Sequence, residues 1–346
     1  MRRVLVRCDG TPEGGLGHLV RALAVAERAR EVGWSVTFAG TVTSGFGRDL
    51  VRRAGVEVVP AAGDLGELAA RYAADLVHVD DYLVGTEARR QVAGAGAVLC
   101  SMEDGTFGRR PADVVVDSAM GAEEPGSPSL ARPDDGSGRV LRGIAYAPLR
   151  AEVLAARERR ATTADPAGGT DVGVLVVMGG SDATGASATI ASVCRRAARI
   201  AGVTVVAPAA RWAAVREAAG EGVELVEPGP GFLDRAAAAD LVVSTASTTT
   251  WELACIGVPT VLLAAVPNQQ HVYDAVVARG AARGLGTLSE VRADPRTAAD
   301  RLGRAAADLL AGRSWAATGL ALVDGLGARR VVEAWDGAVD DRAARG

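Results

Sequence analysis

Gly14-Gly15-Leu16-Gly17-His18 separates an apolar run at residues 4–7 from a run of strong helix formers at 19–28. The first run predicts a β-strand and the second an α-helix. Glycines between them allow a sharp turn and a close approach of the backbone to a ligand. The sequence therefore predicts that His18 stands in the first helical turn, above the strand ends, where open α/β sheets bind ligands.

The same alternation of strand, turn and helix continues through both halves of the chain. The strands expected in the first half are 4–7, 35–39, 56–59, 76–79, 98–101 and 114–117. Those expected in the second half are 172–178, 203–207, 223–226, 241–244 and 258–264. Short, nearly continuous apolar strands in repeated βα units predict parallel sheets covered by helices on both faces. The predicted fold class is therefore α/β, with two Rossmann-like domains and an interdomain cleft.

Two polar segments interrupt this pattern. Residues 123–138 are rich in Pro, Gly, Ser and Asp and predict an excursion loop, whereas 161–170 are small and polar and predict a linker. We therefore expect a first domain at 1–160 and a second domain at 161–325.

Composition excludes several classes of function. The 346 residues include no lysine, so Schiff-base and Walker-type lysine chemistry is excluded, and the net charge of −4 without a basic run argues against nucleic-acid binding. The four cysteines, at positions 8, 100, 194 and 255, lack metal-ligand or redox spacing and indicate reduced thiols of a cytoplasmic protein. No signal peptide and no apolar run of about 20 residues is present, so no membrane span is expected.

The first glycine loop does not have the dinucleotide-binding pattern. His18-Leu19-Val20 stands where that pattern needs its third glycine, and the second expected strand ends in Ala39-Gly40 instead of an acidic residue. His18 is either a helix-capping residue or a general base or ligand for a phosphate or sugar. Asp9, at the end of the first strand, is a candidate to orient it, and Arg21 lies one turn further on the same helix face.

Other strand ends carry groups that suit a phosphate or a sugar. Three such segments lie in the second half: Gly179-Gly180-Ser181, Ser247-Thr248-Thr249-Thr250 with Glu252, and Asn268-Gln269. Glycine turns and helix N-termini present N–H groups to phosphate, although serine and threonine also serve as ordinary N-caps. Asp80 and Asp81 follow the strand at 76–79, without further carboxylates at a metal-ligand spacing, so no metal is expected. His78 is expected to be a core residue with satisfied hydrogen bonds, and His271 is a weaker candidate.

The ordered set of these segments resembles a known family. It is similar to the nucleotide-sugar hydrolase of pseudaminic acid biosynthesis and the related spore-coat polysaccharide proteins, whose fold is that of the glycosyltransferase that makes lipid II. The matching segments are Arg7-Cys8-Asp9-Gly10, Gly17-His18-Leu19-Val20-Arg21, Val79-Asp80-Asp81-Tyr82, Gly179-Gly180-Ser181-Asp182, Ser247-Thr248-Thr249-Thr250-Trp251-Glu252-Leu253 and Asn268-Gln269. The chain departs from the family pattern at Pro267 and at Met102-Glu103-Asp104-Gly105, which lie on the sugar side.

The resemblance implies a GT-B fold in which a C-terminal helix at 326–346 returns to the first domain. It also implies a UDP-linked sugar held by the second domain, with no cofactor and no metal. The catalytic residues implied are His18, Tyr82 and Asn268. The nucleotide-binding residues implied are Gly179, Gly180, Ser181, Ser247, Thr248, Thr249 and Glu252. On the sugar side we expect Asp9, Gly17, Arg21, Asp80 and Gln269.

The function predicted from the sequence is hydrolysis of a UDP-sugar, in which His18 activates water for inverting attack on the anomeric carbon. Two alternatives stay open: a glycosyltransferase that moves the sugar to a small-molecule acceptor, and a non-catalytic nucleotide-sugar binding protein. The sequence does not distinguish water from another acceptor, and it predicts no particular oligomeric state.

Overall fold

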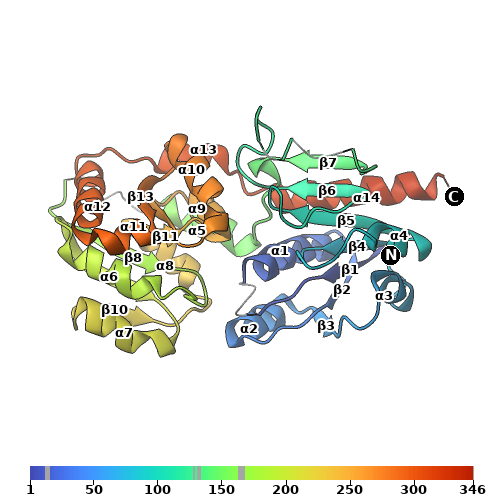
Figure 1. Ribbon diagram of the computed structural model, residues 1–346, viewed down its shortest axis with the longest axis horizontal. Coiled ribbons are helices and arrows are strands. Elements are labelled where there is room, and N and C mark those ends of the chain that lie inside the picture. The colour runs from blue at the N-terminus through green and yellow to red at the C-terminus, as the bar shows by residue number, and fades with distance from the viewer. Residues whose placement is uncertain (12–15, 128, 131–133, 163–167, 346) are drawn as a thin grey trace. The chain divides into compact units, whose positions relative to one another are not determined.

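The computed structural model describes residues 1–346 except 12–15, 128, 131–133, 163–167 and 346. Its contacts divide the chain into two units (Figure 1). Unit 1 comprises Met1–Ala151 together with Gly325–Gly346, and unit 2 comprises Glu152–Asp324. The division falls before the polar segment in which the sequence placed the domain boundary. The last helix belongs to unit 1, although it follows unit 2 in the chain.

Unit 1 contains one parallel sheet of seven strands in the order β3-β2-β1-β4-β5-β6-β7. These strands are β1 (Arg3–Arg7), β2 (Ser35–Ala39), β3 (Glu57–Val59), β4 (Leu76–Val79), β5 (Val98–Glu103), β6 (Val114–Asp117) and β7 (Arg139–Arg142). Its helices are α1 (Gly17–Glu31), α2 (Gly45–Ala54), α3 (Leu65–Arg71), α4 (Ala88–Gly94) and α14 (Gly327–Ala343), with a 3-10 turn η1 (Ile144–Tyr146). The strand β7 is absent from the sequence prediction, because only two apolar residues lie between its terminal arginines.

Unit 2 contains a second parallel sheet, of six strands in the order β10-β9-β8-β11-β12-β13. These strands are β8 (Val172–Val177), β9 (Ile200–Val206), β10 (Glu224–Val226), β11 (Leu241–Thr245), β12 (Thr260–Ala264) and β13 (Arg283–Thr287). The remaining helices are α5 (Ala151–Arg160), which begins at the division, α6 (Ala186–Arg196), α7 (Ala209–Ala219), α8 (Phe232–Ala238), α9 (Thr248–Ile256), α10 (Gln270–Ala278), α11 (Leu288–Ala293), α12 (Pro295–Leu310) and α13 (Ala316–Leu322), with a 3-10 turn η2 (Pro267–Gln269). The predicted α/β class of two Rossmann-like domains is confirmed.

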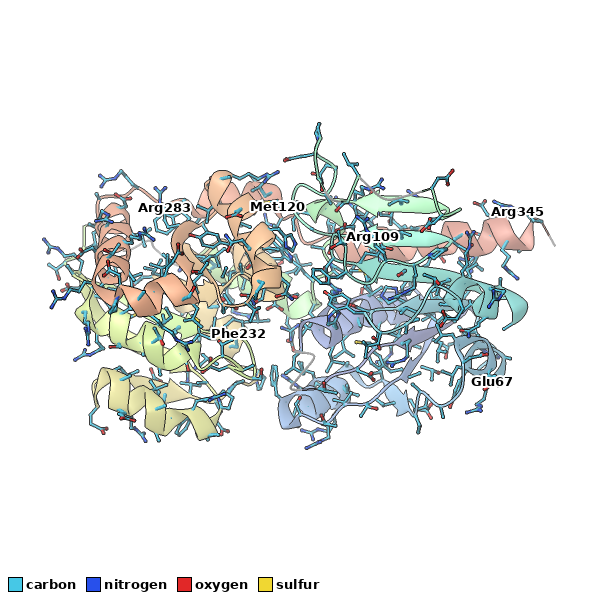
Figure 2. The ribbon with its side chains drawn as sticks, in the orientation of Figure 1. Glu67, Arg109, Met120, Phe232, Arg283 and Arg345 are labelled. Atoms are coloured by element: carbon cyan, nitrogen blue, oxygen red, sulfur yellow. The ribbon has the colours of Figure 1, made fainter. Side chains whose placement is uncertain are left out.

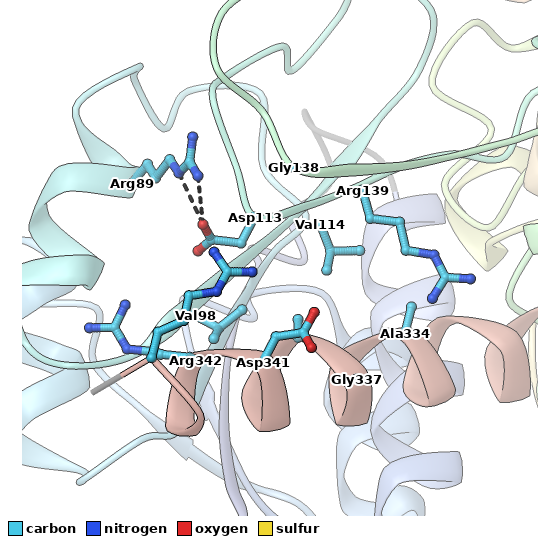
Figure 3. Close-up of a pocket in the computed structure, with 12 residues that line it drawn as sticks. Arg89, Val98, Asp113, Val114, Gly138, Arg139, Ala334, Gly337, Asp341 and Arg342 are labelled. Atoms are coloured by element: carbon cyan, nitrogen blue, oxygen red, sulfur yellow. Dashed lines mark hydrogen bonds and ion pairs between the residues drawn. The ribbon is translucent and has the colours of Figure 1, made fainter.

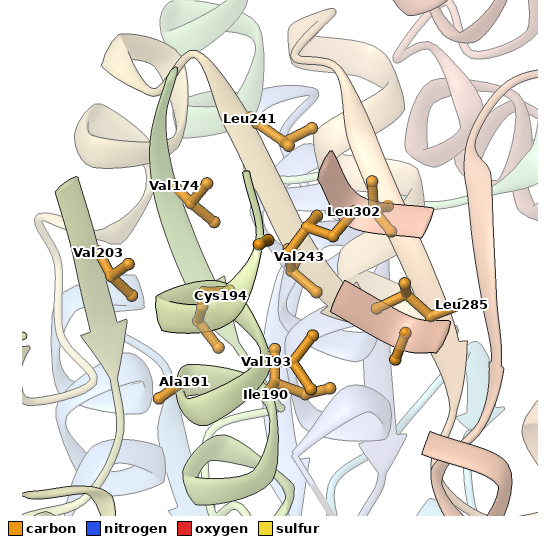
Figure 4. Packing of buried hydrophobic residues seen from close by; sticks show 14 of the residues in the cluster. Val174, Ile190, Ala191, Val193, Cys194, Val203, Leu241, Val243, Leu285 and Leu302 are labelled. Atoms are coloured by element: carbon orange, nitrogen blue, oxygen red, sulfur yellow. The ribbon is translucent and has the colours of Figure 1, made fainter. Parts of the chain in front are cut away.

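The core of unit 2 explains how these short elements hold together. Valine and leucine side chains of β8 and β11, such as Val174 and Val243, meet Ile190 and Val193 of α6 and Leu302 of α12 (Figure 4). All five are buried, and burial of an aliphatic side chain contributes about 1.5–3 kcal/mol. Small β-branched residues therefore fill a core that has few aromatic rings.

All four cysteines are buried and free. None of the described helices combines the length and the apolar character that a bilayer crossing requires.

His78 lies in the core of unit 1, on β4, with no exposed surface. The indole ring of Trp335 on α14 packs beside its imidazole at a centroid distance of 5.1 Å. The sequence prediction is right about the core position and wrong about the hydrogen bonds: neither ring nitrogen has a partner in the described part of the chain. Burial, opposed in part by the charge of Asp80, lowers the pKa of His78 from 6.5 to about 4.

This buried imidazole predicts a loss of stability in acid. The unfolded chain takes up a proton at His78 near pH 6.5, whereas the folded chain takes it up only near pH 4. Because the unfolded state binds more protons between these values, the free energy of unfolding falls as the pH falls. We expect His78 to account for about 2–3 kcal/mol of the decrease between pH 7 and pH 4.5.

Urea unfolding of the wild type and of His78→Leu at both pH values measures this contribution. The variant should lose less stability on acidification than the wild type by that amount. His271→Gln, which changes an exposed histidine, serves as the control and should follow the wild type. An equal pH dependence in all three proteins would contradict the prediction.

Candidate functional site

His18 lies in the first turn of α1, at the point of the sheet where the strand order reverses. The strand β1 pairs with β2 on one side and with β4 on the other, and the chain leaves β1 and β4 at the same carboxyl edge. Loops that follow such a pair of strands form the usual ligand crevice of an open α/β sheet. Residues that follow β1 and β4 therefore meet here, although they are far apart in the sequence.

A carboxylate that follows β4 holds the imidazole of His18. The Nδ1 atom of His18 is 2.6 Å from Oδ1 of Asp80. Burial raises the pKa of Asp80, but the charge of Arg21 and the hydrogen bonds from His18 and Arg21 outweigh burial and hold the pKa well below its usual range. An ionised Asp80 accepts the proton of Nδ1 and leaves the lone pair of a neutral imidazole on Nε2. This is the tautomer that a general base needs.

Arg21 fixes the same carboxylate from one turn further along α1. Its Nε and Nη2 atoms donate to the two oxygens of Asp80 at 2.6 and 2.8 Å, and its Nη1 donates to Asp104 at 2.7 Å. The Nη2 atom also lies 3.2 Å from Nδ1 of His18, but the shorter contact of that nitrogen is with Asp80. Arg21 and Asp80 are 6% and 1% exposed, whereas the side chain of His18 is 18% exposed. The imidazole is thus more accessible than Arg21 and Asp80, the two residues that hold it.

Tyr82 packs against the other side of the imidazole. Its ring meets that of His18 edge to face, with centroids 4.4 Å apart, and its hydroxyl donates to Asp104. Burial and the negative charge of Asp104 raise the pKa of Tyr82 far above its usual range, so its hydroxyl stays protonated. Phe107, in the loop after β5, lies 5.8 Å from the Tyr82 ring. Asp104 and Phe107 are absent from the site predicted from the sequence, although the acidic residue at the end of β5 was a usable signal.

Asp9 does not orient His18, and that part of the sequence prediction is wrong. Its carboxylate accepts hydrogen bonds from Arg7 at 3.0 Å and from the backbone N–H of Thr41 at 2.7 Å. Burial raises the pKa of Asp9, but these two donors outweigh it and the net shift is downward. The residue that orients His18 follows a different strand, because β4 lies beside β1. Gly17 is the first residue of α1, while Gly14 and Gly15 lie outside the described residues.

Unit 2 brings its candidate residues together in the same way. The strand β11 pairs with β8 on one side and with β12 on the other. Gly179, Gly180 and Ser181 follow β8, the hydroxyl run follows β11, and Asn268 and Gln269 follow β12. These three segments therefore occupy adjacent positions at the carboxyl edge of the second sheet.

Helix capping accounts for only part of the hydroxyl run. The N–H of Ser247, the N-cap of α9, donates to the hydroxyl of Thr250 at 3.1 Å. Thr248 and Thr249 are partly exposed, and within the described residues their hydroxyls have no partner. The first turn of α9 therefore presents two available hydroxyls beside backbone N–H groups that helix geometry leaves unpaired.

The other candidate residues in unit 2 differ in their accessibility and in their contacts. Gly179 has a φ of +81° with open space where a Cβ would stand, so glycine is needed there for its conformation. Glu252 is buried, at 4% exposed. Gln269 accepts a hydrogen bond from the N–H of Ala265 at 2.9 Å, whereas Asn268 is exposed.

Two doubly wound parallel sheets, of seven and six strands, are found together in the GT-B fold class. No protein-family model and no curated protein sequence matches the chain. Several solved structures, in contrast, are similar to this chain in fold. MurG from Acinetobacter baumannii is similar, with a TM-score of 0.64 and 16% identity over 97% of this chain and 100% of its own.

Two further structures, each of a complex with a nucleoside diphosphate, share the fold. The glycosyltransferase VinC in complex with dTDP has a TM-score of 0.64 and 16% identity, over 99% of this chain and 100% of its own. The S. aureus MnaA–UDP structure has a TM-score of 0.62 and 12% identity, over 96% of this chain and 95% of its own. At these identities the likeness establishes the fold.

Proposed function

We propose that this protein is a glycosyltransferase that moves a sugar from a nucleoside diphosphate to a small-molecule acceptor, with His18 as the general base. The observation that carries the proposal is the bond between His18 and the buried Asp80, which directs the basic Nε2 away from the carboxylate. A base in this state removes the proton of an acceptor hydroxyl as that oxygen attacks the anomeric carbon. Such an attack inverts the configuration at that carbon.

The proposed roles of the other residues in unit 1 follow from their burial. Asp80 and Arg21 are almost fully covered and bonded to one another, so we assign them to positioning His18 instead of contacting the sugar. Tyr82 stays protonated and bonded to Asp104, which suits a residue that orients the ring of His18. Asp9, bound to Arg7, and Gly17 lie beside this group as candidates for substrate contact.

In unit 2 we propose that the nucleoside diphosphate binds at the first turn of α9. The available hydroxyls of Thr248 and Thr249 and the helix N-terminus stabilise the charge of a leaving diphosphate. The turn at 179–181, which follows the adjacent strand β8, supplies further N–H groups. Asn268, which follows β12, is proposed to contact the sugar, and Glu252 the ribose. VinC and MnaA, whose structures carry dTDP and UDP, support the choice of ligand class.

The surface around His18 favours an organic acceptor over water. Tyr82, Phe107 and Leu83 are 36%, 46% and 92% exposed, and the two rings lie within contact of each other. Exposed apolar groups beside a base provide contact area for the body of an acceptor. Water needs no such surface.

Hydrolysis is the second candidate, because the ordered motifs around His18 and Ser247 resemble the nucleotide-sugar hydrolase family. The chemistry at the anomeric carbon is the same, and water replaces the acceptor hydroxyl. The same positions of His18, Asp80 and Tyr82 therefore serve both reactions.

Release of nucleoside diphosphate from a panel of UDP- and dTDP-sugars, with and without a phenolic acceptor such as 4-methylumbelliferone, separates the two reactions. We expect the acceptor to raise the rate of release at least tenfold and a glycosylated product to form. Steady release at the same rate without acceptor would establish hydrolysis. Absence of release from every sugar, in a protein that binds UDP or dTDP, would contradict both candidates.

A further inference from the structure

The loop after β5 carries a second carboxylate that is bonded to the group around His18. The Oδ1 atom of Asp104 accepts a hydrogen bond from Nη1 of Arg21 at 2.7 Å, and Oδ2 accepts one from the hydroxyl of Tyr82. Both partners also hold the imidazole of His18, Arg21 through Asp80 and Tyr82 through the contact of the two rings. Asp104 is therefore linked to His18 through two different residues.

The backbone holds Asp104 in a short closed turn. Its N–H donates to the carbonyl of Phe107 at 3.1 Å, and the N–H of Phe107 donates back to the carbonyl of Asp104 at 3.0 Å. Between them, the N–H of Gly105 donates to Asp117 at 3.2 Å, and its carbonyl accepts from Nε of Arg109 at 2.8 Å (Figure 2). Asp117 ends β6 and is 2% exposed. Bonds on both sides of the turn thus fix the place of the Asp104 carboxylate.

The group around His18 carries one negative charge in excess. Burial raises the pKa of Asp104, but the charge of Arg21 and the hydrogen bonds from Arg21 and Tyr82 outweigh burial, so the net shift is downward. Asp104 is therefore ionised at neutral pH, as Asp80 is, whereas Tyr82 stays protonated. Two carboxylates thus share the single guanidinium of Arg21.

Charged groups on the neighbouring elements pair with one another or face solvent. The pairs are Arg7 with Asp9 and Asp81 after β1 and β4, and Arg329 with Glu333 and Arg2 with Asp336 on α14. The charged side chains of α2, which packs against α1, are exposed, and the buried His78 is uncharged near neutral pH. The end of β5 and the loop after it add Glu103, Arg109 and Arg110. Over the residues that the structure describes, none of these arginines bonds to the side chain of Asp80 or Asp104.

We propose that Asp104 is a positioning residue of the base: by sharing Arg21 with Asp80, it leaves one negative charge that stabilises the imidazolium formed when Nε2 of His18 takes the acceptor proton. With Asp80 alone, the charge of Arg21 would cancel that of the carboxylate and would oppose a positive charge on the imidazole. The inference rests on the role proposed above for His18. The charge that it assigns to Asp104 is measured without a substrate.

NMR titration of the three histidine imidazoles in the full chain tests this charge, with the His18 signal identified by its loss in His18→Gln. In Asp104→Asn we expect the titration midpoint of His18 to fall by about 0.5–1 pH unit, because the imidazolium loses a nearby negative charge. Asp104→Glu keeps the charge and should stay nearer to the wild type, so an equal fall in both variants would contradict the proposal. If Asp104→Asn does not fold, Asp104→Ser is a second neutral variant.

Asp113→Asn is the matched control. Asp113 also pairs with one arginine, Arg89, whose Nε and Nη2 donate to it at 3.0 and 2.8 Å (Figure 3). Its side chain is 28% exposed, against 25% for Asp104, but it precedes β6 and so lies at the opposite edge of the sheet. His18 should titrate in this variant as in the wild type. A shift as large as that of Asp104→Asn would assign the effect to the net charge of the chain and overturn the proposal, as would an unchanged midpoint in Asp104→Asn.

The pH dependence of kcat connects this charge with the reaction. In Asp104→Asn the acid limb of the profile should move to lower pH together with the midpoint. On the plateau kcat should fall about three- to tenfold, with unchanged affinity for UDP or dTDP, because a weaker base accepts the proton less readily. An unchanged kcat beside a shifted midpoint would overturn the role in positioning the base. Absence of nucleotide release from the wild type would overturn the proposed function instead, and the midpoint would still decide whether Asp104 supplies the charge.

Discussion

Replacement of His18 by glutamine should lower the turnover of the nucleotide sugar by about 10²–10⁴-fold, the usual contribution of a general base. Glutamine preserves a side chain of similar size that can still donate to Asp80 through its amide. It cannot accept the proton of the attacking hydroxyl. The defect should therefore appear in kcat, with little change in nucleotide affinity, because the groups proposed to bind the diphosphate belong to unit 2.

Steady-state kinetics and titration with UDP or dTDP measure these two quantities separately. Arg53→Gln introduces the same residue at an exposed position of α2, and its turnover should stay within about twofold of the wild type. Turnover of His18→Gln that equals the wild type would remove His18 from the mechanism. An equal loss in both variants would assign the effect to something other than the base.

Replacement of Arg21 by leucine should destabilise the protein by about 3–5 kcal/mol, because it leaves charges buried without their partner. Among the residues that the structure describes, Arg21 alone bonds to both Asp80 and Asp104. Burial lowers the pKa of Arg21, but these two carboxylates outweigh burial and raise it well above its usual range. In the variant both carboxylates lose this cation. This cost is larger than that of losing a surface ion pair, because water does not take the place of the lost guanidinium beside these carboxylates.

The pH dependence of this variant has a defined sign. In the wild type the pKa of Asp80 is held well below its unfolded value, so the ion pair contributes stability above about pH 4 and the contribution is lost as the pH falls. In Arg21→Leu the carboxylates protonate more readily. The difference in unfolding free energy between the two proteins should therefore become smaller in acid.

Denaturant unfolding at neutral and acidic pH measures this difference. Arg313→Leu removes an arginine that also donates twice to one aspartate, Asp308, at 3.1 and 2.7 Å, but that arginine is 64% exposed. This control should lose no more than about 1 kcal/mol. If Arg21→Leu does not fold, Arg21→Lys keeps the charge and should fold with an intermediate loss. A loss in Arg21→Leu as small as that in Arg313→Leu would contradict the prediction.

The fold class follows from the pattern of apolar residues along the chain. Runs such as 174–178 and 261–264 are apolar at every position, a pattern that is expected of a strand covered on both faces. The apolar pattern did not predict β7 or β13, because Arg139–Arg142 holds two apolar residues and Arg283–Thr287 contains two glycines. These edge strands form through pairing with β6 and β12, which a local pattern does not record.

Sequence also determined that His18 follows a strand and that hydroxyl groups begin a helix in the second half. Which residue orients His18, however, depends on the order of the strands in the folded sheet. Asp9 is nearer in the chain, but strand order sets β4 beside β1 and brings Asp80 to the imidazole across 62 positions. Local patterns reveal what each segment can form, whereas the contacts that create a site depend on which segments the folded sheet brings together.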